Sequence, residues 1–293
     1  MSFMHISNTY KDQTILLFKR CFAMEKIHGT SAHITKDKDG NVTYFSGGES
    51  HVNFLALFDQ DKIKQVLIDL FGTDEVTVYG EAYGGSQQGM SQTYGKDLKF
   101  IVFDVAVNER FLDLPEAEEI AKKLGLEFVS YEEIDATPEA LDAQRDLPSV
   151  QAVRNGCAEN KDRFGFCPPI REGVVLRPLK EFTDKYGNRV ISKHKRPEYQ
   201  ERVNQPKVID ADKQKVMDDA EAIANEWVVA VRMEHVLDKL GNPTEMKDTG
   251  NVIKAMIEDV MREAAGEIID SKEIRNAIGK RAGKMFKDRV MKG

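Results

Sequence analysis

Residues 25–34 read EKIHGTSAHI and set Lys26 between an apolar run and a predicted strand that begins at Thr30. A lysine can act as a nucleophile only when its amine is neutral, which requires desolvation or positive charge nearby. A lysine followed by two residues and a glycine, here Gly29, is also common in surface turns, where the amine is a solvated charge. Lys26 is therefore a candidate nucleophile only if later parts of the chain supply the neighbours.

The first two-thirds of the chain alternate short β-prone runs with helical ones. The runs TSAHITK and NVTYFS flank the turn signal DKDGN and predict a hairpin over residues 30–46. Apolar spacing and terminal glycines predict helices over residues 60–71 and 114–126. Four further strands are predicted, EVTVYGEAYGG (75–85), LKFIVFDVAV (98–107), REGVVLRPL (171–179) and NRVISKHK (188–195).

The pattern changes after about Pro206, where the β signal nearly disappears. Three helical patterns follow, over residues 211–238, 249–266 and 270–289. One of them carries an apolar stripe that includes Trp227 and Val236, the spacing expected of a buried helix face. We therefore predict an α+β fold with a catalytic domain over residues 1–206 and a small all-helical C-terminal domain over residues 207–293.

Charge is unevenly distributed along the 293 residues, whose formal net charge is −7. A negative total by itself argues against a protein that binds nucleic acid. Yet residues 177–207 and the tail from Asp270 onward are rich in lysine and arginine. Such local basic surfaces can bind a phosphate backbone, and solvated faces with no partner are equally compatible with the pattern.

The three cysteines form an odd and sparse set that fits a reducing cytoplasm. We expect three buried thiols at Cys21, Cys157 and Cys167. A zinc site built on Cys157, Cys167 and His194 is an alternative, although the gap between the two cysteines is too long for a zinc knuckle. No run approaches the roughly 18 apolar residues needed to span a bilayer, and the first residues lack signal-peptide features. A cytoplasmic monomer is expected, encoded by a cell or by a phage.

Acidic, aromatic and basic residues recur in the strands predicted after Lys26. They are, in chain order, Glu81, Phe103, Asp104, Glu172, Arg177, Lys193 and Lys195. Glycines around Glu81 allow a ligand to approach the backbone. Lys193 and Lys195 share one face of their strand, because side chains in a strand repeat every two residues.

This ordered set resembles the covalent nucleotidyltransferases, which include ATP-dependent DNA ligases, RNA ligases and mRNA capping enzymes. The stretches EKIHGTSAHI and EGVVLRP (172–178) are most similar to the second RNA ligase family, typified by phage enzymes that seal nicks in duplex RNA. The helical region WVVAVRMEHVLDKLGNPTEMKDTGNVIKAMIEDV (227–260) looks like that family's C-terminal domain. DNA ligases and capping enzymes would continue into a β-barrel instead. The likeness spans about residues 20–265 and implies an ATP-grasp-like ligase domain of antiparallel sheets and helices.

The resemblance implies a role for each of these residues. Lys26 would attack the α-phosphorus of ATP and carry AMP, and Lys193 and Lys195 would stabilise the charge that grows in the transfer. Mg²⁺, with Mn²⁺ as an alternative, would be held by Glu172 and Asp104. The cofactor-binding set would be Glu25, Ile27, His28, Glu81, Phe103 and Arg177.

Within that set, Phe103 would stack on adenine, Glu81 would accept a hydrogen bond from ribose, and His28 would orient the polyphosphate. Three plainer interpretations stay open. Glu172 could simply pair with a nearby arginine, Phe103 could be core, and His28 could make a structural hydrogen bond. Arg177 stands where the family has a basic residue and could hold a phosphate.

The substrate implied is RNA with 3′-hydroxyl and 5′-phosphate ends, in the form of a nicked duplex. One departure concerns residues 44–49, where the phage enzymes carry an arginine and this chain has none; backbone amides of Gly47 and Gly48 could contact a phosphate instead. Two rivals remain: another covalent nucleotidyltransferase (a DNA ligase or a capping guanylyltransferase), and a non-catalytic RNA-binding protein gated by a nucleotide.

Overall fold

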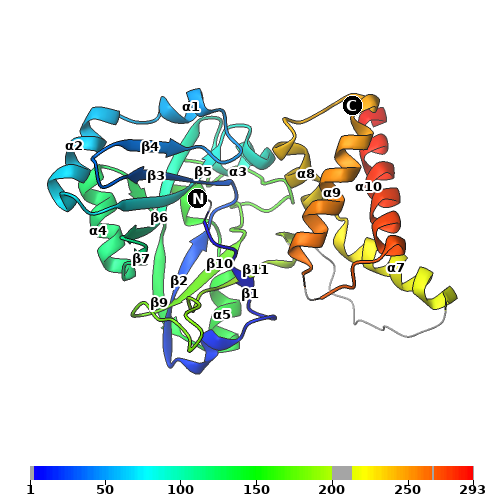
Figure 1. The fold of residues 1–293 in the computed structure, drawn as a ribbon, viewed down its shortest axis with the longest axis horizontal. Coiled ribbons are helices and arrows are strands. Elements are labelled where there is room, and N and C mark those ends of the chain that lie inside the picture. The colour runs from blue at the N-terminus through cyan, green and yellow to red at the C-terminus, as the bar shows by residue number, and fades with distance from the viewer. Residues whose placement is uncertain (1–2, 200–212, 266, 293) are drawn as a thin grey trace. The chain divides into compact units, whose positions relative to one another are not determined.

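The computed structural model describes residues 3–199, 213–265 and 267–292. The chain divides into two compact units, residues 1–198 and 199–293, each of which is described by itself. The first unit is built on two β-sheets, and the second is helical (Figure 1). The domain boundary predicted between residues 206 and 207 lies outside the described residues.

The first sheet joins strands from both ends of the first unit. Its strands are β1 (Ser7–Asn8), β11 (Ser192–Lys195), β10 (Gly173–Pro178), β2 (Arg20–Lys26) and β9 (Tyr131–Asp135), in that spatial order. Only the β1–β11 pair is parallel, and the other three pairs are antiparallel. Helix α5 (Pro138–Arg145) packs against β9, β10 and β11. The order brings β2, which ends at Lys26, beside a strand that follows it by about 150 residues.

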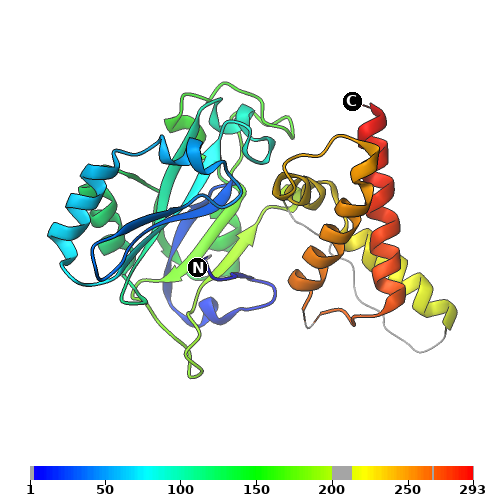
Figure 2. The same cartoon turned by 45° about the horizontal axis from the view of Figure 1, so that its top comes forward.

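The second sheet is a nearly continuous antiparallel meander. Its strands are β4 (Val42–Phe45), β3 (Thr30–Lys36), β5 (Val76–Gly84), β6 (Leu98–Val107) and β7 (Arg110–Phe111), with β8 (Glu127–Phe128) parallel to β6. Helices α1 (His51–Leu55), α2 (Gln60–Phe71) and α4 (Leu114–Leu124) pack against this sheet, as Figures 1 and 2 show. The short helices α3 (Ser91–Tyr94) and α6 (Val150–Arg154) complete the unit, together with 3₁₀ turns at Thr14–Leu17, Gln87–Gly89 and Pro197–Tyr199.

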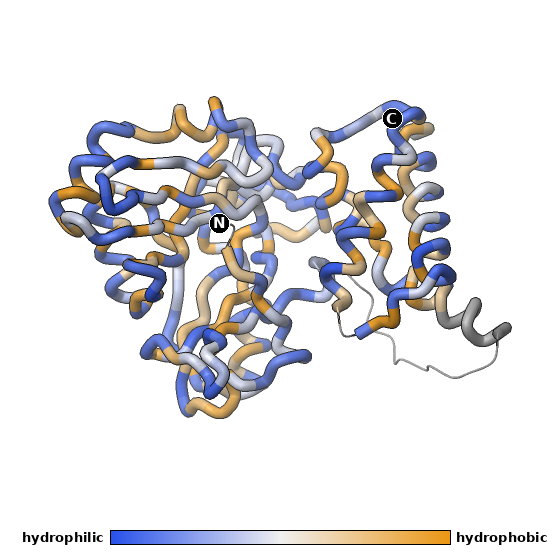
Figure 3. Tube along the Cα trace, in the orientation of Figure 1, coloured by the Kyte–Doolittle hydropathy of each residue, from blue (hydrophilic) through white to orange (hydrophobic). Residues whose placement is uncertain are grey.

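The second unit contains four helices in its described residues. They are α7 (Lys213–Trp227), α8 (Ala230–Lys239), α9 (Thr249–Glu263) and α10 (Lys272–Lys292), with a 3₁₀ turn at Met246–Asp248. Helix α10 lies against both α7 and α9 (Figure 2). A Cβ on Gly279 or Gly283 would meet the side chain of Ile253 at 3.1 or 3.0 Å, so these glycines let α9 and α10 pack closely. Figure 3 shows hydrophobic residues recurring among hydrophilic ones along both helices.

The mixed α+β architecture with antiparallel sheets and a following helical region is confirmed. Helix α2 has the bounds expected; it is capped by the Asp59 carboxylate, which accepts from Lys62 N, and it ends at Gly72 with a φ of 51°. The single helix predicted over residues 211–238 is wrong, because the described part is broken at Val228 into α7 and α8. The expectation of three buried thiols also fails, since Cys167 is exposed while the other two are buried. None of the helices within the described ranges is long and apolar enough to cross a membrane.

Candidate active site

The buried carboxylate of Glu172 contacts basic side chains from β2, from the loop after β2 and from β11. Its Oε2 atom lies 3.0 Å from Lys26 Nζ and 3.0 Å from His28 Nδ1. Its Oε1 atom lies 2.9 Å from Lys195 Nζ. Glu172 is 1% exposed. In the cluster of Lys26, His28, Glu172 and Lys195, the carboxylate, the imidazole and Lys195 are buried, and Lys26 is partly exposed.

Strand register explains why residues so distant in sequence meet. Gly173 begins β10 and is paired with Lys26 on one side and with Lys195 on the other. A Cβ at Gly173 would lie 2.2 Å from the backbone oxygen of His194, so only glycine lets β11 approach this closely. Glu172, immediately before Gly173, is therefore delivered between the two lysines. Lys193 lies two residues before Lys195 on β11 and is half-buried.

The electrostatics of Glu172 are set by these cations. Burial would raise the pKa of Glu172, but the charges of Lys195, Lys26 and His28 outweigh burial and hold that pKa well below its usual range. Glu172 is therefore ionised at neutral pH and neutralises the lysines around it. The alternative in which Glu172 simply pairs with Arg177 is wrong, because Arg177 pairs with Asp104 and Glu181 instead.

Glu81 lies on β5 and reaches the loop that follows Lys26. Its Oε1 atom accepts a hydrogen bond from the backbone N–H of Gly29, at 3.0 Å. Burial raises the pKa of Glu81 to about 7, and the nearby Lys26 only partly offsets that effect. A Cβ at Gly29 would lie 2.3 Å from the backbone oxygen of Ala82, so glycine is required where the loop crosses β5.

Residues that flank Lys26 have mainly supporting contacts. The carboxylate of Glu25 accepts from Ser149 Oγ at 2.6 Å and from the backbone N–H groups of Val150 and Gln151, and so caps the start of α6. Burial raises the pKa of Glu25. Ile27 is buried, 4% exposed. The cofactor-binding roles predicted for Glu25 and Ile27 stay predictions.

Asp104 and Arg177 lie in a buried ion-pair network of their own. Asp104 Oδ1 lies 3.2 Å from Arg177 Nη1, and Asp104 Oδ2 lies 2.6 Å from Arg189 Nη1. Glu181 completes the network by pairing with both arginines. The two oxygens of Asp104 are thus taken by arginines, which does not fit the predicted metal-ligand role. Arg177 is only 2% exposed, which does not fit the predicted contact with a phosphate.

Arg189 belongs to this network and was given no role by the sequence. Its guanidinium also lies 3.8 Å from the centroid of the Phe111 ring. The one available signal was a charged residue directly before the apolar pair Val190 and Ile191, a position where an arginine needs a buried partner. The network ties β6, which carries Phe103, to the segment that leads into β11.

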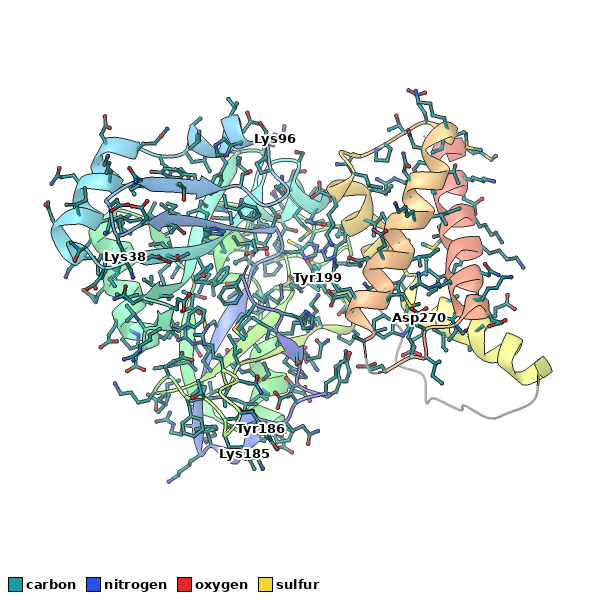
Figure 4. All side chains as sticks on the ribbon, viewed as in Figure 1. Lys38, Lys96, Lys185, Tyr186, Tyr199 and Asp270 are labelled. Atoms are coloured by element: carbon teal, nitrogen blue, oxygen red, sulfur yellow. The ribbon has the colours of Figure 1, made fainter. Side chains whose placement is uncertain are left out.

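The predicted basic surface over residues 177–207 is not one surface in its described part. Arg177, Arg189 and Lys195 are buried and paired. Exposed charge is concentrated in the β10–β11 loop, where Lys185 Nζ lies 4.9 Å from the centroid of the Tyr186 ring, at the tip seen in Figure 4. Some basic residues of this segment therefore form buried ion pairs, and others are exposed to solvent.

The glycine pair in residues 44–49 gives limited support to a phosphate contact. The backbone N–H of Gly48 donates to Thr30 Oγ1 at 2.9 Å, so that amide already has a partner. Gly47 has a φ of 62°, and a Cβ there would lie 2.3 Å from the backbone oxygen of Ser31. Replacing Gly47 with alanine would therefore disturb the loop whatever its amide binds.

A metal ion fits the site only in part. Among the residues that the structure describes, no group of three or more His, Cys, Asp or Glu side chains could hold one. Mg²⁺ does not need such a group, because it commonly uses one or two carboxylates together with substrate phosphates and waters. Glu172 would donate to such an ion only if phosphates displaced its contacts with Lys26, His28 and Lys195. For the zinc alternative, His194 is instead 2.7 Å from Asp142 Oδ1.

The residues that carry this geometry lie within a match to a known protein family. The profile of the RNA ligase family matches residues 19–195, which is more than half of the chain and contains Lys26, Glu172 and Lys195. The chain belongs to the RNA ligase family. No curated protein sequence matches it.

Solved structures with a similar fold include RNA ligases from Naegleria gruberi. A variant of that enzyme with AMP and Mn has a TM-score of 0.51 and 16% identity, over 68% of this chain and 57% of that one. A variant with ATP and Mn has a TM-score of 0.51 and 17% identity over the same shares. The enzyme with pyrophosphate has a TM-score of 0.51 and 18% identity. This chain spans 57% of the length of these relatives, and the likeness concerns their fold.

Proposed function

We propose that this protein is an ATP-dependent RNA ligase that joins a 3′-hydroxyl to a 5′-phosphate at nicks in duplex RNA, through AMP carried on Lys26. The observation that carries the proposal is the contact of a single buried carboxylate, Glu172, with Lys26, His28 and Lys195. A chain that merely binds RNA has no need to enclose two lysines around one buried acid.

The first step would be transfer of AMP from ATP to the enzyme. Lys26 Nζ forms a bond to the α-phosphorus and loses a proton, while the bond from that phosphorus to the oxygen of the departing pyrophosphate breaks. An oxygen of the RNA 5′-phosphate then forms a bond to the same phosphorus, and the bond from that phosphorus to Lys26 Nζ breaks and releases the amine. The RNA 3′-hydroxyl finally attacks the 5′-phosphorus, loses its proton and displaces AMP as the phosphodiester forms. Phosphoryl transfers of this kind depend on positioning and on charge stabilisation more than on covalent chemistry by the protein.

The neighbouring side chains would stabilise the transition state and bind the nucleotide. Lys193 and Lys195 favour the transition state, because negative charge grows on the oxygens of the leaving pyrophosphate. Glu81 would accept from a ribose hydroxyl, and Phe103 would stack on adenine. Mg²⁺, or Mn²⁺, would neutralise phosphate charge when it is held by Glu172 together with phosphate oxygens. Lys26 Nζ lies 3.0 Å from the Glu172 carboxylate in the structure, so attack on ATP would require that ion pair to be exchanged for phosphate contacts.

Two alternatives predict different products. A capping guanylyltransferase would be labelled by GTP, and a DNA ligase would seal DNA nicks at least as well as RNA nicks. The helical second unit supports the RNA ligase over both of these, since their chains would continue into a β-barrel. A non-catalytic RNA-binding protein would bind RNA and never become covalently labelled.

Intact mass spectrometry tests the proposal. Wild-type protein and Lys26→Ala would be incubated with ATP and Mg²⁺, and parallel samples with GTP. One added AMP on the wild type, reversed by pyrophosphate, with none on Lys26→Ala, is the expected result. Lack of any adduct on wild-type protein that carried none at the start would overturn the ligase proposal. Sealing assays on nicked RNA, DNA and hybrid duplexes then decide the substrate, and preference for DNA nicks would remove the RNA assignment.

A further inference from the structure

The segment that precedes β2 spans from one sheet of the first unit to the other. Strand β1 pairs with β11 at Ser192 and Lys193, and Thr9 N and Thr9 Oγ1 both donate to the backbone oxygen of Lys193, at 2.9 and 3.1 Å. In Figure 1 this chain is the dark blue ribbon that leads into β1. Four residues before β1, Phe3 reaches the other sheet.

Phe3 packs into a group of aromatic side chains on β5, β6 and β7. Its ring centroid lies 4.9 Å from that of Phe103, with an angle of 78° between the planes. It lies 5.0 Å from the Tyr79 ring at 66° and 5.9 Å from the Phe111 ring at 80°. All three are edge-to-face contacts, the arrangement that aromatic pairs favour.

Strand periodicity places these contacts on the same face of the sheet as Glu81. Phe100 packs against Phe54 of α1, so Phe100 points toward the helices. Ile101 is paired with Glu81 and follows Phe100, so both point to the opposite face. Tyr79 comes two residues before Glu81 and shares its face. Phe103 lies at an irregularity in the β5–β6 pairing, where Tyr79 is paired with Asp104, and the contacts of Phe3 with both rings place Phe103 beside Tyr79. Phe3 therefore covers part of the face that carries Glu81 and Phe103.

We propose that Phe3 is a base-positioning residue: by holding Phe103 and Tyr79 edge-on, it forms one wall of the adenine site and fixes the Phe103 ring for stacking. This inference rests on the proposed function of the same site. Phe103 is half-buried, and its edge contact with Phe3 orients the ring, so loss of Phe3 removes that constraint. Loss of Phe3 should therefore weaken nucleotide binding and leave the rate of the chemical step at Lys26 nearly unchanged.

The test is the rate of self-adenylylation at increasing ATP for the full chain, with Phe3→Ala, Phe3→Tyr and wild type. Phe3→Ala should raise the KM for ATP about tenfold, roughly the cost of ordering one side chain when the nucleotide binds, and should leave kcat within about twofold. Phe3→Tyr should restore the wild-type KM, because its ring keeps the edge contacts. Phe182→Ala is the matched control: it removes a ring whose edge contact is with Phe18, at 5.5 Å, and it should leave KM unchanged.

Three results would overturn the inference. An unchanged KM in Phe3→Ala means that Phe3 does not position the base, and faster labelling means that the ring obstructs the site. A fall in kcat with a lowered Tm and no change in KM means a purely structural role. If wild-type protein is never adenylylated, the proposed function fails, and calorimetric titration with ATP still decides the inference: equal Kd values for wild type and Phe3→Ala would reject it.

Discussion

Lys26 and Glu172 are 146 residues apart in the sequence, and their side chains form a 3.0 Å ion pair. The pair exists because Lys26, at the end of β2, is the register partner of Gly173, at the start of β10. The same glycine is paired with Lys195 on β11. A single strand start thus fixes the nucleophile candidate, its counter-ion and a second lysine.

Replacing Glu172 with glutamine should abolish adenylylation and weaken the fold. The change keeps the size of the side chain but leaves Lys26 and Lys195 without their counter-charge. Breaking a buried pair typically costs about 3 kcal/mol of unfolding free energy, which urea unfolding would measure. The labelling rate should fall by about 10²-fold or more. Glu133→Gln, which removes an exposed pair with Arg20, is the control and should change neither quantity by much. Labelling at the wild-type rate would rule out a catalytic role for Glu172.

Replacing Asp104 with asparagine distinguishes a structural residue from a metal ligand. Because Asp104 lies between Arg177 and Arg189, the substitution should cost about 3 kcal/mol of unfolding free energy. The Mg²⁺ concentration that gives half-maximal labelling should not change. A several-fold rise in that concentration, with stability preserved, would restore the metal-ligand role that the sequence suggested.

Glu81 should make stability depend on pH. Burial raises its pKa from 4.5 to about 7, so the folded protein retains a proton that the unfolded chain releases. Stability from this group is present below pH 4.5 and is lost as pH rises to about 7. Glu81→Gln removes the titration, so across that window its unfolding free energy should fall less than that of wild type, by on the order of 3 kcal/mol. Parallel curves for the two proteins, from thermal unfolding at several pH values, would contradict this.

Removing the second unit should separate the first chemical step from sealing. A chain that ends near Gln205 keeps Lys26, Glu172 and Lys195, all of which lie in the first unit. It should be adenylylated at close to the wild-type rate and should fail to seal a nicked duplex. A gel assay with a labelled strand measures both. Full sealing by the shortened chain would show that the helical unit is not needed for substrate binding.

Asp259 should be the most sensitive charged position of the second unit. Its carboxylate lies 2.6 Å from Arg232 Nη1 and 2.8 Å from Lys239 Nζ, and Arg232 is only 1% exposed. Asp259→Asn removes one charged partner of that buried guanidinium, which should cost the second unit about 3 kcal/mol in denaturant unfolding. Adenylylation should persist, because Lys26 belongs to the other unit. A loss below about 1 kcal/mol would show that the remaining contacts of Arg232, such as the Trp227 ring 5.2 Å away, compensate its charge.

Local features of the fold were set by local sequence. Apolar spacing, Asp59 and Gly72 define α2, and the two-residue period of a strand puts Lys193 and Lys195 on one face of β11. Turn signals define the β3–β4 hairpin. These features depend on residues within a few positions of one another, so a periodic pattern is enough to predict them. The ordered motifs also indicated the RNA ligase family, because family likeness is a property of sequence order.

Only the tertiary structure decided which charged groups meet. The family resemblance implied a metal-ligand role for Asp104, and only the structure shows that two arginines from another part of the chain enclose it. Glu25 was predicted to bind the nucleotide, which stays a prediction, and only the structure shows that its carboxylate caps α6. Phe3 lies outside every motif and still reaches Phe103. The physical reason is that strand register and the packing of the two sheets determine which residues contact a buried charge or ring. Neither depends on a local sequence pattern.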